Sequence, residues 1–167
     1  MDIEQYKKEV SAINWHEFTG YKYYEPDSVP TALISLALAQ NISTSRNLLI
    51  NEKVTNYLLH TIGNNHSGTY YSVVKKALPF IIQVALFGNH VVARNCAIDA
   101  LIDLDCFYPD AEEVSSEESE ELLQFVRTTI ERTILENNEY FIKIASNDIR
   151  NKSMIEDLIG LLENEPD

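Results

Sequence analysis

The spacing of apolar residues is the feature that most limits the folds open to this chain. Along most of its 167 residues, apolar side chains recur at intervals of three and four, and strict alternation of apolar and polar residues is rare. These intervals match the turn of an α-helix and place the apolar side chains on one face. Only 5 glycines interrupt the pattern. We therefore expect an all-α protein of about seven or eight helices.

Residues that favour turns or caps divide this pattern into separate helices. Ser115 and Glu118 are spaced as a capping box, which predicts that a helix begins directly after Ser115. Gly63 and Asn64 accept left-handed backbone angles and should end the helix that precedes them. Pro79 falls in the middle of another predicted helix and should bend its axis. The predicted helices cover residues 1–13, 31–39, 44–62, 69–87, 91–104, 116–136, 139–145 and 152–162.

The length of the chain favours one domain, because it is enough to bury about two-thirds of the unfolded surface. We predict a single helical domain over residues 1–167. Residues 1–30 should form an N-terminal helix and an aromatic loop, and residues 31–104 two helical hairpins. Residues 105–167 should form an acidic loop followed by the C-terminal helices.

Neither the cysteines nor the N-terminus carries a signal for secretion or metal binding. Cys96 and Cys106 lack CxxC spacing and a second pair, so we expect buried free thiols. The N-terminal segment lacks the basic and apolar regions of a secretion signal, and no apolar run is long enough to span a bilayer. We therefore expect a cytoplasmic protein with no membrane partner.

Residues 77–104, ALPFIIQVALFGNHVVARNCAIDALIDL, resemble a HEAT repeat. In such repeats the first helix carries a kinking proline, a short polar turn follows, and the second helix begins with a Val-Arg step before paired small and large apolar residues. The matching positions are Pro79, Gly88-Asn89, Ala93-Arg94, Ala97, Ala100 and Leu101. Ala93 replaces the valine, and Asn89 replaces the usual aspartate but can still cap a helix. The resemblance implies a HEAT-like stack of antiparallel helical hairpins, with two hairpins over residues 31–104.

The stretch just before it is similar to bacterial HEAT-like proteins in which a His-Gly-Thr-like turn leads into an Ala-Pro-Phe helix. It reads NYLLHTIGNNHSGTYYSVVKKALPF over residues 56–80. We associate such proteins with interbacterial toxin loci. The resemblance therefore implies an immunity protein, which binds and neutralises a cognate toxin.

Charge is divided unevenly along the chain. The formal net charge is −13, but residues 97–167 hold 19 of the 26 acids and 5 of the 13 bases, a charge of −14, and residues 1–96 carry +1. Such an asymmetry steers a basic partner toward one side of a protein. Enzymes that cut nucleic acids need positive surfaces for phosphate, and an acidic patch can block such a surface. We expect a monomer that binds a toxin with a basic C-terminal domain, such as a nuclease.

The partner should bind where acidic residues surround an aromatic side chain. Tyr108 lies in such a segment and has the make-up of an interface anchor. The expected contact residues are Asp105, Tyr108, Asp110, Glu112, Glu113, Glu117 and Glu120. Glutamates at this density repel one another along a helix, so a solvated face without a partner remains the other interpretation.

The motifs of phosphate, zinc and acyl chemistry are missing from the sequence, among them GxGxxG, the Walker loop, HExxH and GxSxG. Basic patches with interleaved aromatics, which hold nucleic acid, are missing too. We expect no catalysis, cofactor, metal or nucleic-acid partner. Three alternatives remain: a metal pair of His60 and His66, a carboxylate pair of Asp99 and Asp103, and an enzyme pocket in which His66 meets Asp99.

A second class of function also suits a helical-repeat protein. An adaptor would bind a peptide in a groove lined by the second helices of the hairpins. Its contact residues would include Asn56, Arg94, Asp99 and Asp103.

Overall fold

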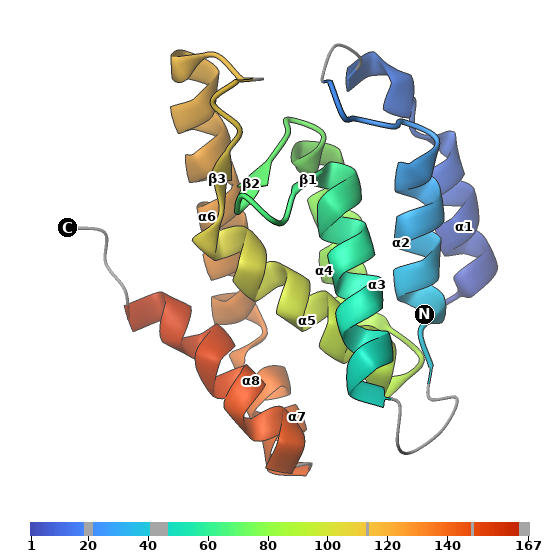
Figure 1. Cartoon of the computed structure of the whole chain (residues 1–167). Helices are drawn as coiled ribbons and strands as arrows, with labels where there is room; N and C mark the ends of the chain where they lie inside the picture. The colour runs from blue at the N-terminus through green and yellow to red at the C-terminus, as the bar shows by residue number, and fades with distance from the viewer. Residues whose placement is uncertain (19–21, 41–46, 113, 148, 164–167) are drawn as a thin grey trace.

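Eight α-helices account for most of the residues described by the computed structural model, which are 1–18, 22–40, 47–112, 114–147 and 149–163. The helices are α1 (Ile3–Ala12), α2 (Ser28–Leu38), α3 (Asn47–Ile62), α4 (Val74–Phe87), α5 (Val91–Cys106), α6 (Ser116–Glu136), α7 (Asn138–Asn147) and α8 (Ile149–Gly160). Short 3-10 helices cover Trp15–Phe18 and Leu161–Glu163. The prediction of a mostly helical chain is confirmed (Figure 1).

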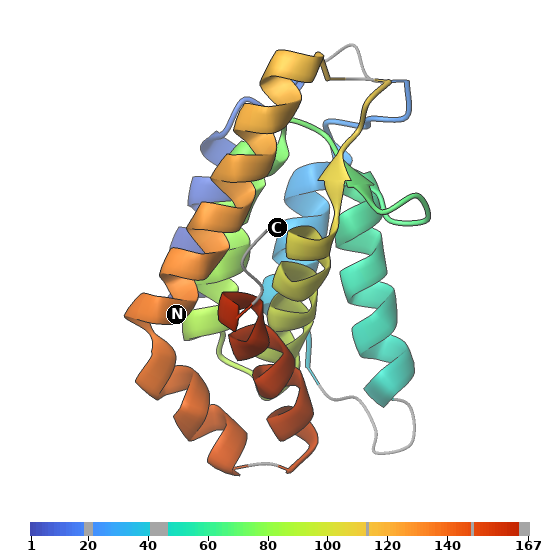
Figure 2. The same ribbon diagram turned by 90° about the vertical axis from the view of Figure 1, so that its left-hand side faces the viewer.

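The helices pack in pairs, and the pairs lie side by side. Helix α2 packs on α3 and α4 packs on α5, and these pairs meet through contacts of α2 with α4 and of α3 with α5. Helix α6 then lies on α4 and α5, α8 lies on α5, and α7 packs mainly against α8. Figure 2 shows α4 behind α6 on the left and α3 on the right, with α5 between them. Helix α5 is thus the central helix, in contact with α2, α3, α4, α6 and α8.

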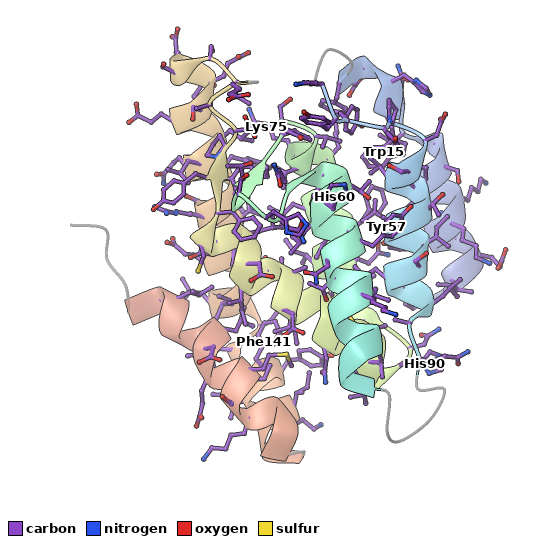
Figure 3. The ribbon with its side chains drawn as sticks, in the orientation of Figure 1. Trp15, Tyr57, His60, Lys75, His90 and Phe141 are labelled. Atoms are coloured by element: carbon purple, nitrogen blue, oxygen red, sulfur yellow. The ribbon has the colours of Figure 1, made fainter. Side chains whose placement is uncertain are left out.

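Small and branched apolar side chains make the contact between α4 and α5. Helix α5 buries three alanines, a cysteine and larger apolar residues, so that neighbouring helices approach it on several sides. Helix α1 covers one end of this core, where the Tyr6 ring packs edge-on against Phe80 of α4 with ring centroids 5.7 Å apart. Phe141 of α7 is fully buried at the opposite end and is labelled in Figure 3. One core therefore extends from α1 to α7.

A small three-stranded sheet corrects the all-α prediction. Strand β1 (Gly63–Asn64) pairs antiparallel with β2 (Thr69–Tyr70), and β2 pairs parallel with β3 (Tyr108–Pro109). Residues 69 and 70 were expected to begin a helix, but α4 begins at Val74. Hydrogen bonds with a distant segment explain the difference, because the Tyr108 amide donates to the Gly68 carbonyl and the Asp110 amide to the Tyr70 carbonyl. Strands of two residues are too short to show an alternating pattern.

Gly63 ends α3 for a reason other than the one expected. Among the described residues, a positive φ occurs only at Gly68, at 65°, so neither Gly63 nor Asn64 is left-handed. A Cβ atom at position 63 would instead lie 2.6 Å from the Cα atom of Tyr70. Glycine is needed there because the two strands approach closely.

Other details of the sequence-based prediction have mixed outcomes. The predicted capping box is present, since the Ser115 hydroxyl accepts from the Glu118 amide and the Glu118 side chain accepts in return. Helix α6 covers residues 116–136 as predicted. Cys96 is buried as expected, but Cys106 is exposed because it ends α5 at the surface. Within the described segments, no helix has both the length and the apolar character needed to cross a bilayer.

We predict that Gly63→Ala destabilises the protein by roughly 1–3 kcal/mol, because the new methyl group must displace backbone atoms of β2. Gly160→Ala is the matched control, since a Cβ there would meet no atom within 4 Å and alanine favours the helix. Urea denaturation of both variants measures the difference. Equal stability of the two would contradict the close approach at β1.

Removal of the α6 cap should cost about 1 kcal/mol, because Ser115→Ala leaves the Glu118 amide without its side-chain acceptor. Ser116→Ala, one residue further along, removes a hydroxyl that does not cap α6. Thermal and urea denaturation should therefore show a loss for the first variant and little change for the second. A similar loss in both would mean that the capping contact contributes nothing specific.

Candidate functional site

The predicted contact residues gather at one end of the molecule. Asp105 lies in the last turn of α5, Tyr108 in β3, and Asp110 and Glu112 in the connection to α6. This connection and the β1–β2 hairpin lie together in the upper half of Figure 1. Glu117 and Glu120 follow in the first turns of α6, and Glu113 falls outside the described residues. We call the described members, which are Asp105, Tyr108, Asp110, Glu112, Glu117 and Glu120, the acidic end.

The Tyr108 side chain is held firmly and still faces solvent. Its backbone amide donates to the Gly68 carbonyl at 3.0 Å, which fixes β3 against the β1–β2 hairpin. The side chain is 57% exposed. Arg127 of α6 lies with its guanidinium carbon 5.6 Å from the centre of the ring. The ring is therefore supported by a cation–π contact while part of its surface remains open.

Asp110 serves the fold of the connection directly. Its Oδ2 atom accepts from the Thr69 hydroxyl at 2.9 Å, and its Oδ1 atom accepts from the Glu112 amide at 3.0 Å. The first bond joins the connection to β2, and the second makes a tight turn of the Asx type. Asp110 thus positions its neighbours, although sequence reasoning placed it among the contact residues.

Asp105 is half-buried in the last turn of α5, near enough to α6 for the charges of Arg127 and Glu131 to act on it. Burial raises the pKa of its carboxyl above the ordinary value, the Arg127 charge opposes that rise, and Glu131 adds to it. Arg127 and Glu131 were not singled out from the sequence. Their one-turn spacing on α6 was the available signal, since residues four apart share a helix face.

Three glutamates of the acidic end remain directed toward solvent. Glu112, Glu117 and Glu120 are exposed, and none of them forms an ion pair within the described residues. Glu117 also lies in the first turn of α6, where the helix dipole favours a negative charge. Their charge is thus available to a partner.

A second pair of acids lies on α5, outside the acidic end. Burial raises the pKa of Asp99 to about 6, with a further contribution from the charge of Asp103. Burial also raises the pKa of Asp103. Neither carboxyl makes a hydrogen bond or ion pair in the part of the chain that the structure describes. Both are half-buried.

The other residues expected of an adaptor are used within the chain. The Arg94 guanidinium donates to the Gly88 carbonyl at 2.6 Å and so stabilises the turn between α4 and α5. The Asn56 side chain accepts from the Asn65 side chain at 3.3 Å. These two residues therefore support connections between helices.

The His60 and His66 rings come near each other, with centroids 6.5 Å apart. Both side chains are exposed. Among the described residues, no group of three His, Cys, Asp or Glu side chains is arranged to hold a metal ion.

A shallow cleft of about 320 Å³ was not predicted from the sequence. It lies between the segment before α2 and the end of α3, where Figure 3 labels Tyr57 and His60. The Tyr24 hydroxyl donates to the Trp15 carbonyl at 2.9 Å and anchors this segment. Tyr23 faces solvent beside it, with 66% of the side chain exposed. Of the residues that line the cleft, Tyr23 and Tyr24 belong to the predicted aromatic loop, and His60 was considered as a metal ligand; neither pattern predicted a cleft.

Comparison with protein-family models, with curated proteins and with solved structures gives no match to this chain.

The raised pKa of Asp99 predicts a pH effect on stability. A carboxyl whose pKa is higher in the folded state binds its proton more tightly there, so ionisation between about pH 4 and 6 lowers the free energy of unfolding. Asp99→Asn should remove this loss and stabilise the protein at pH 7.5 by on the order of 1 kcal/mol, allowing for solvent screening.

Urea denaturation at several pH values between 4 and 8 measures the effect. Asp157→Asn, which removes an exposed carboxyl from α8, is the control and should reproduce the wild-type profile. A wild-type profile in Asp99→Asn would show that burial at this site does not oppose ionisation.

Proposed function

We propose that this protein is an immunity protein that binds and neutralises a cognate bacterial toxin through the acidic end. The observation that carries the proposal is the exposed ring of Tyr108, which Arg127 supports, in the same short segment of chain as the exposed Glu112, Glu117 and Glu120. The proposed partner has a basic toxin domain, such as a nuclease, whose positive surface the acidic end covers. Binding requires no metal or cofactor in this mechanism, and the protein acts as an inhibitor without catalysis.

Electrostatics supports both the rate and the orientation of such binding. Residues 97–167 carry −14, and the described part of this charge includes the exposed glutamates of the acidic end. A concentrated field of one sign steers an oppositely charged protein and raises its association rate by one to three orders of magnitude. Contacts at the centre of an interface then determine how long the complex lasts.

The helix arrangement supports the HEAT-like part of the proposal. Helices α2 and α3 form one antiparallel pair, and α4 and α5 form another (Figure 1). The first helices of the two pairs, α2 and α4, contact each other, and so do the second helices, α3 and α5. We propose that α6 and α8 take the same two places in a third, irregular unit, in which α7 is inserted. In such a stack the connections between units gather at one end, which is where the acidic end lies.

An adaptor that binds a peptide is the second candidate, and one observation favours it. Asp99 and Asp103 are half-buried on the second helix of a hairpin, without a counter-charge among the described residues. A basic peptide that ran along α5 would supply that charge. The acidic end ranks first because it also offers the exposed ring of Tyr108.

We predict that Glu112→Lys, Glu117→Lys and Glu120→Lys together weaken binding of the natural partner by at least about tenfold, mainly because association becomes slower. The affinity of the triple variant should also depend less on salt concentration. The tagged protein captures the partner from the native organism, and mass spectrometry identifies it. Surface plasmon resonance with the purified partner then measures the association rate and the affinity at two salt concentrations.

The matched control is Asp99→Asn with Asp103→Asn, which should leave the affinity unchanged if the acidic end is the interface. Co-expression gives the functional test. Cells that express the captured toxin domain by itself should stop growing; co-expression of the wild-type protein should restore growth, and co-expression of the triple variant should not. A harmless partner, or one that is lost only in the Asp99 and Asp103 variant, would favour the adaptor.

A further inference from the structure

The cleft between the segment before α2 and the end of α3 has two walls that are far apart in the sequence. Tyr57, His60 and Thr61 line one wall, and their spacing of three and four residues places them on one face of α3. The other wall is made by residues 22–25 together with Ser28 at the start of α2. None of these residues belongs to the acidic end, so a ligand of the cleft occupies a separate site.

Three of the hydroxyls that line the cleft are already used within the chain. The Tyr24, Ser28 and Thr61 hydroxyls each donate to a backbone carbonyl, at 2.9, 2.6 and 2.7 Å. The other two hydroxyls, those of Tyr23 and Tyr57, make no hydrogen bond in the part of the chain that the structure describes. The hydroxyl donors left for a ligand therefore belong to these two rings.

The same two rings also offer flat apolar surface, one from each wall. Tyr23 is 66% exposed and Tyr57 is 39% exposed. The Lys22 ammonium lies 4.9 Å from the centre of the Tyr23 ring and so supports it. Lys22 and Glu25 carry opposite charges, so the cleft does not select strongly for a charged ligand. The lining favours an uncharged ligand with apolar surface and hydrogen-bond acceptors.

The shallowness of the cleft limits the ligand further. Its volume of about 320 Å³ is at the small end of ligand sites. A site that buries little surface binds well only when the ligand loses little conformational freedom. A proline-rich segment meets this condition, because polyproline II is extended and stiff before binding. Its carbonyls are free acceptors and its prolines have no N–H, which matches a site whose unused hydroxyls can donate.

We propose that this cleft binds a proline-rich segment of a partner protein in the polyproline II conformation. The proline rings pack on Tyr23 and Tyr57, and the hydroxyls of these two residues donate to carbonyls of the segment. Aromatic-lined grooves recognise proline-rich segments in this way in several kinds of small domain. The inference goes beyond the proposed function, because binding here requires neither the acidic end nor a toxin.

The test uses three blocked hexapeptides, made of L-proline, of D-proline, or of alternating glycine and serine. The D-proline peptide has the composition and hydrophobicity of the L-proline peptide but forms the mirror-image helix, so it measures attraction that does not depend on shape. NMR follows the tyrosine-ring resonances of the full-length protein during each titration. We expect the L-proline peptide to shift the Tyr23 and Tyr57 resonances and to bind at least about fivefold more tightly than the other two.

Variants assign the binding to the two rings. Tyr23→Ala and Tyr57→Ala should each reduce the affinity for the L-proline peptide several-fold, and circular dichroism should show that both remain helical. Tyr23→Phe and Tyr57→Phe keep the rings and remove the donating hydroxyls, so each should bind about two- to fivefold more weakly than wild type. Phe87→Ala is the matched control, because it removes a similarly exposed ring outside the cleft and should bind as wild type does.

Equal affinities for the L-proline and D-proline peptides would overturn the inference. Wild-type affinity in both Tyr23→Ala and Tyr57→Ala would also overturn it, since the peptide would then bind elsewhere. Because the three peptides are uncharged and the cleft lies outside the acidic end, either result leaves the proposed function untouched.

Discussion

Packing around α5 is the constraint on which the rest of the structure depends. This helix contacts α2, α3, α4, α6 and α8, and its buried residues include small alanines that let the neighbouring helices approach. A helix surrounded in this way has little surface left for polar side chains. Asp99 and Asp103 share one face of this helix, and Asp105 lies in its last turn on a different face. All three are partly buried, which raises their pKa values. The central helix thus determines which helices lie beside one another, and it carries three partly buried acids.

The small sheet positions the candidate site relative to α5. Strand β3 follows α5 directly and pairs with β2, so the end of the central helix determines where Tyr108 lies. Asp110 then ties the connection to Thr69, and the Ser115 cap sets the start of α6. The Ser115 cap is a local contact, and the other contacts join the segment between α5 and α6 to the β1–β2 hairpin. Their combined effect is to hold an exposed aromatic ring in place before any partner arrives, which lowers the entropy cost of binding.

Features with a local cause were predictable from the sequence. The capping box at Ser115 and Glu118 predicted α6 correctly because all of its atoms lie within four residues. The sheet was not predictable, because β2 and β3 are far apart in sequence and each has two residues. The exposure of Cys106 followed from the end of α5, which lies two residues beyond its predicted end.

The residues of the candidate site also differ in whether they could be predicted from neighbouring residues or only from tertiary contacts. Sequence reasoning singled out Tyr108 and its surrounding acids because they lie within one short segment of chain. It missed Arg127 because that residue reaches the ring from the middle of α6. It also treated Asp110 as a contact residue, since hydrogen bonds to Thr69 and to the backbone cannot be read from a run of acids. A net charge therefore identifies the side of a protein that attracts a partner. Which acids are free to act depends on tertiary contacts. Among the described residues Glu112, Glu117 and Glu120 form no ion pair, whereas Asp110 accepts from the Thr69 hydroxyl and the Glu112 amide.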